Sequence, residues 1–435
     1  MRRFFQYLFL FFLAFSFFFL IAIIRPVWCD EIWVYGFSHN ISEGMVIYRD
    51  FNALQMPLYF FISSFFLFIF GDYVISTHLF DCILIGLLFL MMYKKIGIKS
   101  IFILFILTIG YSGYNLLSLF LLMSILFFID AGKYHDFLIG LLVGLIFITK
   151  QNIGIALFVP YIYYSKKKFR SIFYFFIPFL IISFYFILTS SYFSFLDCVF
   201  GSMFDFNQQN KKLFFSFLLI EFFVICHLLI LINKNRSYDK RLLYTMFFQV
   251  ISYPICDDSH LFLALIPYFY ILFSYSFDKK KFYFLLFFIF YSFYSLFLRP
   301  FDVSFENNSF YLRNLSTVKM EFLDDFSYFS KKYDHSYFID WQAYVYKIYY
   351  RKPIDRFDFM LSGNCGYHGV RKLIKEVENY CQKETCLFVI YQDDFNSSIS
   401  QWKEIIDYVK NHYSSIEIDD GFYLLGNEDY IHEKE

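Results

Sequence analysis

"FFQYLFLFFLAFSFFFLIAII", residues 4–24, is an apolar run that directly follows Arg2 and Arg3. At about 1.5 Å per residue, a helix of this length crosses the roughly 30 Å hydrocarbon layer of a bilayer. The residues that follow, "RPVWCDE", offer no small-x-small cleavage site, and further hydrophobic segments come later. We therefore expect an uncleaved membrane helix with its N-terminus in the cytoplasm.

The composition of the whole chain agrees with this interpretation. Hydrophobic residues make up 59% and aromatic residues 26% of the 435 residues, and the mean hydropathy is +0.50. A soluble chain of this size cannot bury so much apolar surface in one core. The 38 basic and 38 acidic residues cancel, so no overall field indicates nucleic acid as a partner. The composition predicts a polytopic α-helical membrane protein.

Four clusters of basic residues predict how the chain crosses the membrane. The clusters lie at residues 94–99, 166–170, 234–241 and 279–281. The positive-inside rule assigns all four to the cytoplasm, so the chain crosses an even number of times between them. Besides the first helix, we expect spans over residues 73–93, 172–190, 213–232, 242–256, 261–277 and 282–298. The 14-residue run at 57–70 is too short to span and fits an interfacial or re-entrant helix.

The region from residue 101 to 164 allows two interpretations. Four short spans would turn outward at "GYSGYN" and at "TKQN", whereas two long spans would be broken only at "DAGKYHD". We prefer four, because one helix over 138–164 would bury Lys150 near mid-bilayer at a cost of about 2.5–3.5 kcal/mol. The total is then about eleven spans, or about nine with two long helices.

The C-terminal part of the chain has a different character. We expect a transmembrane domain over residues 1–298, with a first outer loop at 25–72, and a small extracytoplasmic α/β domain over 299–435. In the latter, "SYFID" and "CLFVIYQ" are typical of strands, "SQWKEIIDYVKNHY" of an amphipathic helix, and "IEIDDGFYLLG" of a hairpin. Three cysteines, Cys365, Cys381 and Cys386, allow one bridge, and their spacing does not predict a zinc site.

This topology gathers polar groups from four loops on the outer face. A carboxylate there could deprotonate an acceptor hydroxyl, while a cation could hold a phosphate leaving group. Other interpretations are that Asp30 and Glu31 cap a juxtamembrane helix and that Lys150 extends to the interface. The residues are Asp30, Glu31, His39, Arg49 and Asp50 in the first loop, Lys150 to Asn152, residues 205–212, and Asp257, Asp258 and His260.

Several of these features resemble one enzyme family. An acidic pair after the first membrane helix, a "PLYF" element opening a short helix that ends in "FG", and "GLLVGLIFITKQ" are similar to motifs of the GT-C glycosyltransferases. That family includes protein O-mannosyltransferases and the aminoarabinose transferase of lipid A. Two positions depart from the pattern, since Met56 replaces a proline and His78 replaces an arginine of many relatives.

The resemblance implies transfer of a sugar from a polyprenyl-phosphate donor to a glycan, lipid or protein acceptor outside a bacterial-type plasma membrane. It implies no cofactor and no metal, with a divalent cation as an open alternative. An oligosaccharide polymerase or ligase, a lipid or sugar transporter, and an inactive relative are the other interpretations. The implied roles are catalytic for Asp30 and Glu31, phosphate-binding for Lys150, Arg49 and His260, and substrate-binding for Tyr59, Asp50, Gln151, Asp257 and Asp258.

Overall fold

The computed structural model describes residues 2–24, 29–107, 113–129, 135–202, 212–213, 215–234, 240–253, 255–256, 258–275, 333, 335–339, 359–360, 369–391, 403–418 and 422–426. The predicted span at 282–298 and the predicted domain boundary after residue 298 lie outside the described residues. The chain divides into two compact units, which we describe separately. The first comprises Met1–Tyr35, Gln55–Phe184 and Lys211–Asn314, and the second comprises Gly36–Leu54, Tyr185–Asn210 and Leu315–Glu435.

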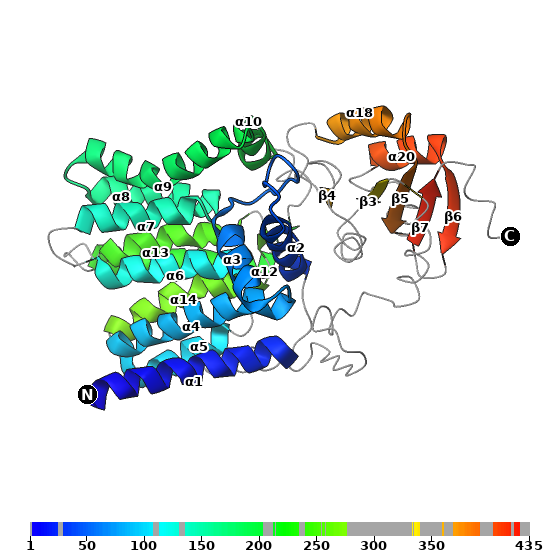
Figure 1. Ribbon diagram of the computed structural model, residues 1–435. Coiled ribbons are helices and arrows are strands. Elements are labelled where there is room, and N and C mark those ends of the chain that lie inside the picture. The colour runs from blue at the N-terminus through cyan, green and yellow to red at the C-terminus, as the bar shows by residue number, and fades with distance from the viewer. Residues whose placement is uncertain are drawn as a thin grey trace. The chain divides into compact units, whose positions relative to one another are not determined.

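The first unit is built mainly from helices that run side by side (Figure 1). Some of these elements extend beyond the unit's borders. The elements up to residue 188 are α1 (Arg2–Ile24), α2 (Cys29–Ser42), α3 (Leu58–Phe70), α4 (Val74–Ile96), the 3₁₀ turn η1 (Gly97–Lys99), α5 (Ser100–Leu107), α6 (Gly113–Phe128), α7 (His135–Phe147), α8 (Gln151–Tyr164) and α9 (Lys168–Leu188). Those that follow in this unit are β1 (Lys212–Leu213), α12 (Phe215–Lys234), α13 (Lys240–Phe248), the 3₁₀ turn η3 (Gln249–Ser252), β2 (Ile255–Cys256) and α14 (Asp258–Tyr275).

Among the described residues, three helices are long and apolar enough to cross a membrane. They are Arg2–Ile23, Val74–Leu107, which runs from α4 through η1 into α5, and Lys168–Leu188. Six shorter apolar helices of 10–17 residues accompany them, including α3. The apolar run after Pro57 therefore forms a short helix of 13 residues, as its length predicted.

The region 101–164 contains the helices α5 to α8. The eight-residue α5 continues from α4 through η1, so the four short spans of the preferred interpretation stay a prediction, while its break between two helices near Lys150 is confirmed. The break between α7 and α8 lies at residues 148–150, where the backbone of Lys150 is extended (φ −146°, ψ 104°). Gly154 allows the two helices to pack closely, because a Cβ atom there would lie 2.2 Å from the Cα of Phe147. Lys150 thus occupies a turn and not the middle of a long helix.

The predicted helix over 242–256 is wrong in its second half. Helix α13 ends at Phe248, and a 3₁₀ turn and the strand β2 follow. The physical reason is non-local, since β2 pairs in parallel with β1, with Lys212 opposite Ile255. That pairing uses backbone groups that a helix would satisfy internally.

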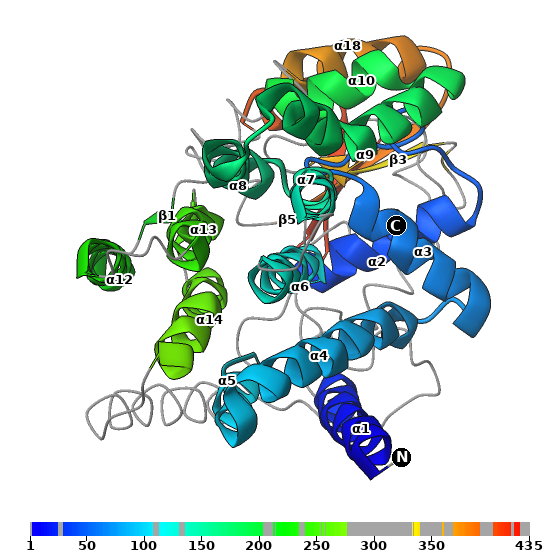
Figure 2. The same ribbon diagram turned by 90° about the vertical axis from the view of Figure 1, so that its left-hand side faces the viewer.

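Lysine side chains distinguish one end of the helix bundle from the other. The ammonium groups of Lys94 and Lys95 lie 5.3 and 5.5 Å from the ring of Phe127, near the last residue of α6. Lys240, at the start of α13, lies 5.7 Å from the ring of Tyr164, the last residue of α8. Lys166 to Lys168 follow Tyr164 almost directly in the chain, so described lysines from three of the four basic clusters lie at one end of the bundle, called here the lysine end. Figure 2 views these helices nearly end-on, with α1 beside α4.

The second unit contains a five-stranded sheet of order β4-β3-β5-β7-β6. Strands β3, β4 and β5 are parallel, whereas β7 is antiparallel to both β5 and β6. Two helices pack on one face, because Leu373, Val377, Ile405 and Val409 join the strand residues in one buried core. The elements of this part are β3 (His335–Ile339), β4 (Phe359–Met360), α18 (Gly369–Cys381), β5 (Cys386–Tyr391), α20 (Lys403–His412), β6 (Ser414–Ile418) and β7 (Phe422–Gly426).

The elements predicted for this part of the chain are confirmed. The strands at Ser336 and Cys386, the amphipathic helix α20 and the hairpin β6–β7 all form. A disulfide joins Cys381, at the end of α18, to Cys386, at the start of β5. The second unit also contains α10 (Tyr192–Leu196) and the π-helical turn η2 (Asp197–Gly201). Lys372 of α18 forms a 2.9 Å ion pair with Asp197.

Candidate functional site

A buried tyrosine–carboxylate pair joins α3 to α4 in the first unit. The hydroxyl of Tyr59 donates a 2.7 Å hydrogen bond to Oδ1 of Asp81. One turn earlier on α4, Nδ1 of His78 lies 3.8 Å from Oδ2 of Asp81. All three side chains are buried, so the phenol and the imidazole stabilise a carboxyl group that water does not reach.

The first turn of α3 also contacts the turn between α7 and α8. The backbone N–H of Leu58 donates a 3.2 Å hydrogen bond to the carbonyl of Ile148, which precedes Thr149 and Lys150. The preceding Pro57 has no N–H, a property that suits it to a helix start. The sequence elements "PLYF" and "TKQ", far apart in the chain, therefore lie side by side.

Lys150 is held in place by side chains of α6. Its ammonium group donates a 2.7 Å hydrogen bond to Oδ1 of Asn115 and lies 5.7 Å from the ring centroid of Tyr114. Such a position over an aromatic face is favourable for a cation. Asn115 is buried, whereas Lys150 is partly exposed, so the cation has fixed partners on one side and an accessible side.

The first residue of α6, Gly113, packs against Tyr59 in the first turn of α3. A Cβ atom at Gly113 would lie 2.1 Å from Cζ of Tyr59, so only glycine leaves room for that ring. Tyr59, His78, Asp81, Asn115 and Lys150 therefore form one neighbourhood, called here the polar cluster. It lies at the end of α6 and α8 opposite the lysine end.

Two further predicted outer segments reach the same end of the bundle. Nδ2 of Asn152 donates a 3.1 Å hydrogen bond to the carbonyl of Tyr253, four residues before Asp257. The β1–β2 pair brings Lys212 and Leu213 to Ile255 and Cys256. The "TKQN" turn therefore contacts Tyr253, and residues 212–213 pair with residues 255–256. Gln151 is buried at the start of α8 and His260 is partly exposed in the first turn of α14.

The acidic pair after the first helix lies in the first turn of α2. Glu31 is only 6% exposed, whereas the side chain of Asp30, like those of Asp257 and Asp258, lies outside the described part of the chain. One turn later, Tyr35 donates a 3.0 Å hydrogen bond to Asp72, between α3 and α4. The closeness of Asp30 and Glu31 to Lys150 stays a prediction.

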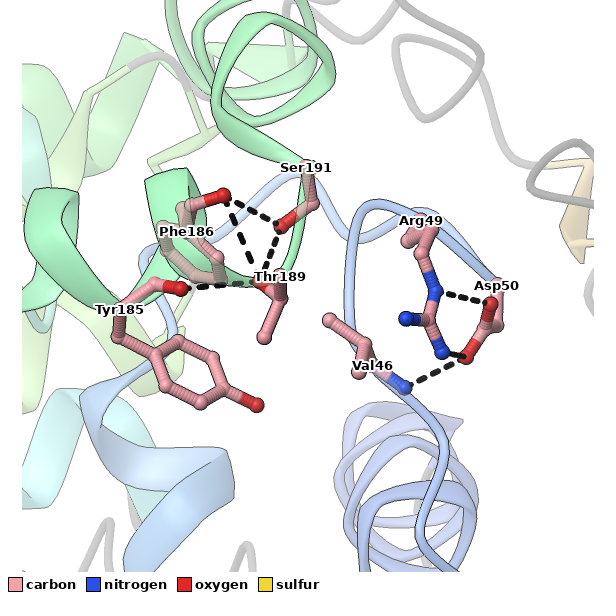
Figure 3. Close-up of polar contacts among 7 residues, drawn as sticks. All are labelled: Val46, Arg49, Asp50, Tyr185, Phe186, Thr189 and Ser191. Atoms are coloured by element: carbon pink, nitrogen blue, oxygen red, sulfur yellow. Dashed lines mark hydrogen bonds and ion pairs between the residues drawn. The ribbon is translucent and has the colours of Figure 1, made fainter.

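Arg49 and Asp50 form an ion pair in the second unit (Figure 3). Nε and Nη2 of Arg49 donate hydrogen bonds of 2.8 and 2.9 Å to the two carboxylate oxygens of Asp50. Asp50 also accepts a 2.7 Å hydrogen bond from the N–H of Val46. The guanidinium lowers the pKa of the Asp50 carboxyl, and the carboxylate raises the pKa of Arg49. The charge of Arg49 is therefore already neutralised by Asp50, which weakens the attraction of Arg49 for a phosphate.

An aromatic anchor holds this loop. Tyr48 has a positive φ of 68°, which is unusual for a bulky residue. Its ring is fully buried, 5.2 Å from the rings of both Phe186 and Phe195, and burial raises the pKa of its hydroxyl. Figure 3 shows the ion pair beside the end of α9, where the hydroxyls of Thr189 and Ser191 lie 2.9 Å apart.

Sequence reasoning missed part of the polar cluster. His78 was named only as a departure from the family pattern and Asp81 was not named, although ionisable residues inside an apolar helix are a signal of a functional site. Asn115 lies in the "GYSGYN" segment, which was interpreted only as a turn. In the described part of the chain, no group of three His, Cys, Asp or Glu side chains is placed to hold a metal ion.

Comparisons with family models, with curated proteins and with solved structures find no match to this chain.

Proposed function

We propose that this protein is a membrane glycosyltransferase that uses a polyprenyl-phosphate sugar as donor. The observation that supports the proposal is the meeting of the first turn of α3 with the turn that contains Lys150, through the Leu58–Ile148 hydrogen bond. It brings a buried tyrosine–carboxylate pair and a partly exposed lysine to one end of an apolar helix bundle. A polyprenyl-phosphate donor matches this arrangement, because its apolar tail suits the apolar helix bundle and its anionic phosphate suits the lysine.

The chemistry assigns a role to each group. An acceptor hydroxyl attacks the anomeric carbon of the sugar, and the bond from that carbon to the phosphate oxygen breaks. The polyprenyl phosphate leaves with the electron pair, and Lys150 stabilises its charge. The acceptor proton passes to a carboxylate of the first outer segment, Asp30 with Glu31 beside it.

The proposal includes an orientation in the membrane. The lysine end faces the cytoplasm by the positive-inside rule, and the polar cluster faces the outside. The Cys381–Cys386 disulfide supports an extracytoplasmic C-terminal part, since disulfides persist mainly in oxidising compartments. Cysteine substitutions test this in intact cells, with Tyr253→Cys expected to react with an impermeant maleimide and Lys168→Cys only after permeabilisation. Equal reaction of both before permeabilisation would contradict the orientation.

Transfer from a purified polyprenyl-phosphate sugar in proteoliposomes tests the activity. We expect Lys150→Gln to lower turnover roughly 100-fold or more, as loss of a charge-stabilising donor does in other enzymes. Lys166→Gln, an exposed lysine at the opposite end, is the matched control. Asp30→Asn should also abolish transfer, with the exposed Glu43→Gln as its control. Full turnover in folded Lys150→Gln and Asp30→Asn variants would refute these roles.

A carrier of polyprenyl-linked glycans is the second candidate, because His78 and Asp81 are buried within α4. Ionisable groups inside a span often line a proton or substrate pathway. Flipping of a fluorescent polyprenyl-phosphate sugar across the liposome bilayer without any transfer product, lost in Asp81→Asn, would favour the carrier over the transferase.

A further inference from the structure

A hollow of about 340 Å³ lies at the ends of α18 and α20 in the second unit. This volume is at the lower end of the range of small-ligand pockets, about 300–1,000 Å³. Nothing in the proposed reaction at the polar cluster uses it. It is lined by Glu378, Cys381, Gln382, Tyr408, His412 and Tyr413.

Four of the polar side chains that line this hollow form no hydrogen bond within the described structure. Among the described residues, no protein atom forms a hydrogen bond with the carboxylate of Glu378, the amide of Gln382 or the hydroxyls of Tyr408 and Tyr413. Burial first, and then the charges of Tyr408 and Glu378, raise the pKa of Tyr413 to about 12. Burial also raises the pKa of Tyr408, so both phenols are hydrogen-bond donors at neutral pH, beside a carboxylate that only accepts.

The walls of the hollow are fixed by packing. The rings of Tyr408 and His412, one turn apart on α20, stack with centroids 4.3 Å apart and an interplanar angle of 25°. Nδ1 of His412 donates a 2.7 Å hydrogen bond to the carbonyl of Tyr408. The ring of Tyr413 contacts the buried Phe388 at 4.7 Å. The disulfide from Cys381 ties the end of α18 to β5, so a ligand would meet a preformed site.

We propose that this hollow binds a saccharide. Vicinal sugar hydroxyls both donate and accept hydrogen bonds, so they match two phenol donors, a carboxylate acceptor and an amide that does both. The apolar C–H face of a sugar ring can pack on the aromatic side chains. The further role of this site, docking of an acceptor glycan, rests on the proposed transferase function.

A cationic ligand is the competing chemistry. A carboxylate beside tyrosine rings can bind an ammonium group. However, His412 covers one face of Tyr408, and Phe388 packs against Tyr413. The hollow therefore presents the hydroxyl groups of the two tyrosines to a ligand more than the faces of their rings. This arrangement favours a polyol over a cation.

Saturation-transfer difference NMR on the full-length protein in lipid nanodiscs tests the proposal. The probes are glucose, mannose, galactose and N-acetylglucosamine, with choline as a cationic comparison. We expect saturation transfer to at least one sugar, and roughly fivefold weaker binding of it in Glu378→Gln and in Tyr408→Phe, the effect of one lost hydrogen bond. Glu376→Gln and Tyr380→Phe, on the same helix α18 but outside the lining, are the matched controls and should bind as the unmodified protein does.

Three results would overturn the proposal. The first is that none of the four sugars receives saturation transfer from the protein. The second is equal sugar binding in the lining and control variants, and the third is a choline signal that exceeds the signal of every sugar. The measurement needs neither donor nor turnover. Saccharide binding at the hollow in a protein without glycosyltransferase activity would therefore refute the proposed function alone. Glycosyltransferase activity in a protein that binds no saccharide at the hollow would refute only this inference.

Discussion

The phenol of Tyr59 and the carboxylate of Asp81 form a 2.7 Å hydrogen bond between two helices, and both side chains are buried. The pair fixes the start of α3 on α4. Because the same turn of α3 also bonds to Ile148, the hydrogen bond of Tyr59 helps to position the turn that contains Lys150.

Replacing Tyr59 by Phe should destabilise the protein by about 1–3 kcal/mol, since it leaves a buried carboxylate without one of its partners. Thermal unfolding in detergent measures the effect as a lower Tm. Tyr163→Phe is the matched control, because Tyr163 is 63% exposed. Equal Tm values for the two variants would show that the Tyr59 hydrogen bond contributes nothing to stability.

Gly113→Ala should destabilise the protein by about 1–3 kcal/mol, because the new methyl group overlaps the ring of Tyr59. A double-mutant cycle with Tyr59→Leu checks the cause. The smaller side chain should restore much of the stability lost on adding the methyl group. Additive losses would mean that the methyl group acts through another contact.

Asn115→Leu should lower transferase turnover roughly 10- to 100-fold without changing the net charge, because Lys150 loses a charge-assisted hydrogen bond of about 1.5–3 kcal/mol. Turnover in the proteoliposome assay measures this effect. Ser118→Ala, also buried on α6 but bonded only to the helix carbonyl of Tyr114, is the control. If both variants turn over equally, the orientation of Lys150 does not matter.

The ion pair of Arg49 and Asp50 should stabilise its loop in a pH-dependent way. The pKa of Asp50 is lowered by Arg49 in the folded protein, so the contribution is complete above the unfolded pKa of about 4. It is lost as the pH falls through the lower folded pKa. The Tm difference between the unmodified protein and Asp50→Asn should therefore shrink below about pH 4. The exposed Asp407→Asn is the control, and a difference that grows on acidification would contradict the assignment.

The disulfide between Cys381 and Cys386 should be detectable chemically. Reduction of the denatured protein should add two sites for a polyethylene-glycol maleimide, seen as a gel shift, and Cys381→Ser with Cys386→Ser should remove that difference. Loss of the bridge should cost about 2 kcal/mol, since the loop that it closes is short. An unchanged gel shift after reduction would show that both cysteines are free thiols.

Local patterns in the sequence determined much of the secondary structure. Apolar length predicted α1, α4, α9 and the short α3, and alternation of apolar residues predicted the strands and the hairpin. The energetic cost of burying Lys150 was enough to predict the break between α7 and α8. These predictions succeeded because they depend on residues that are neighbours in the sequence and on the free energy of placing each residue in an apolar medium.

Contacts between distant residues were decided only by the tertiary structure. The Tyr59–Asp81 bond, the fit of Tyr59 against Gly113, the Asn115–Lys150 bond, and the β1–β2 pair that ends α13 early all join residues far apart in the chain. The same holds for the order β4-β3-β5-β7-β6 and for the hollow beside α18 and α20. Hydropathy predicts which segments form helices, but not which faces meet, because that choice depends on the packing and hydrogen bonding of side chains from several segments at once.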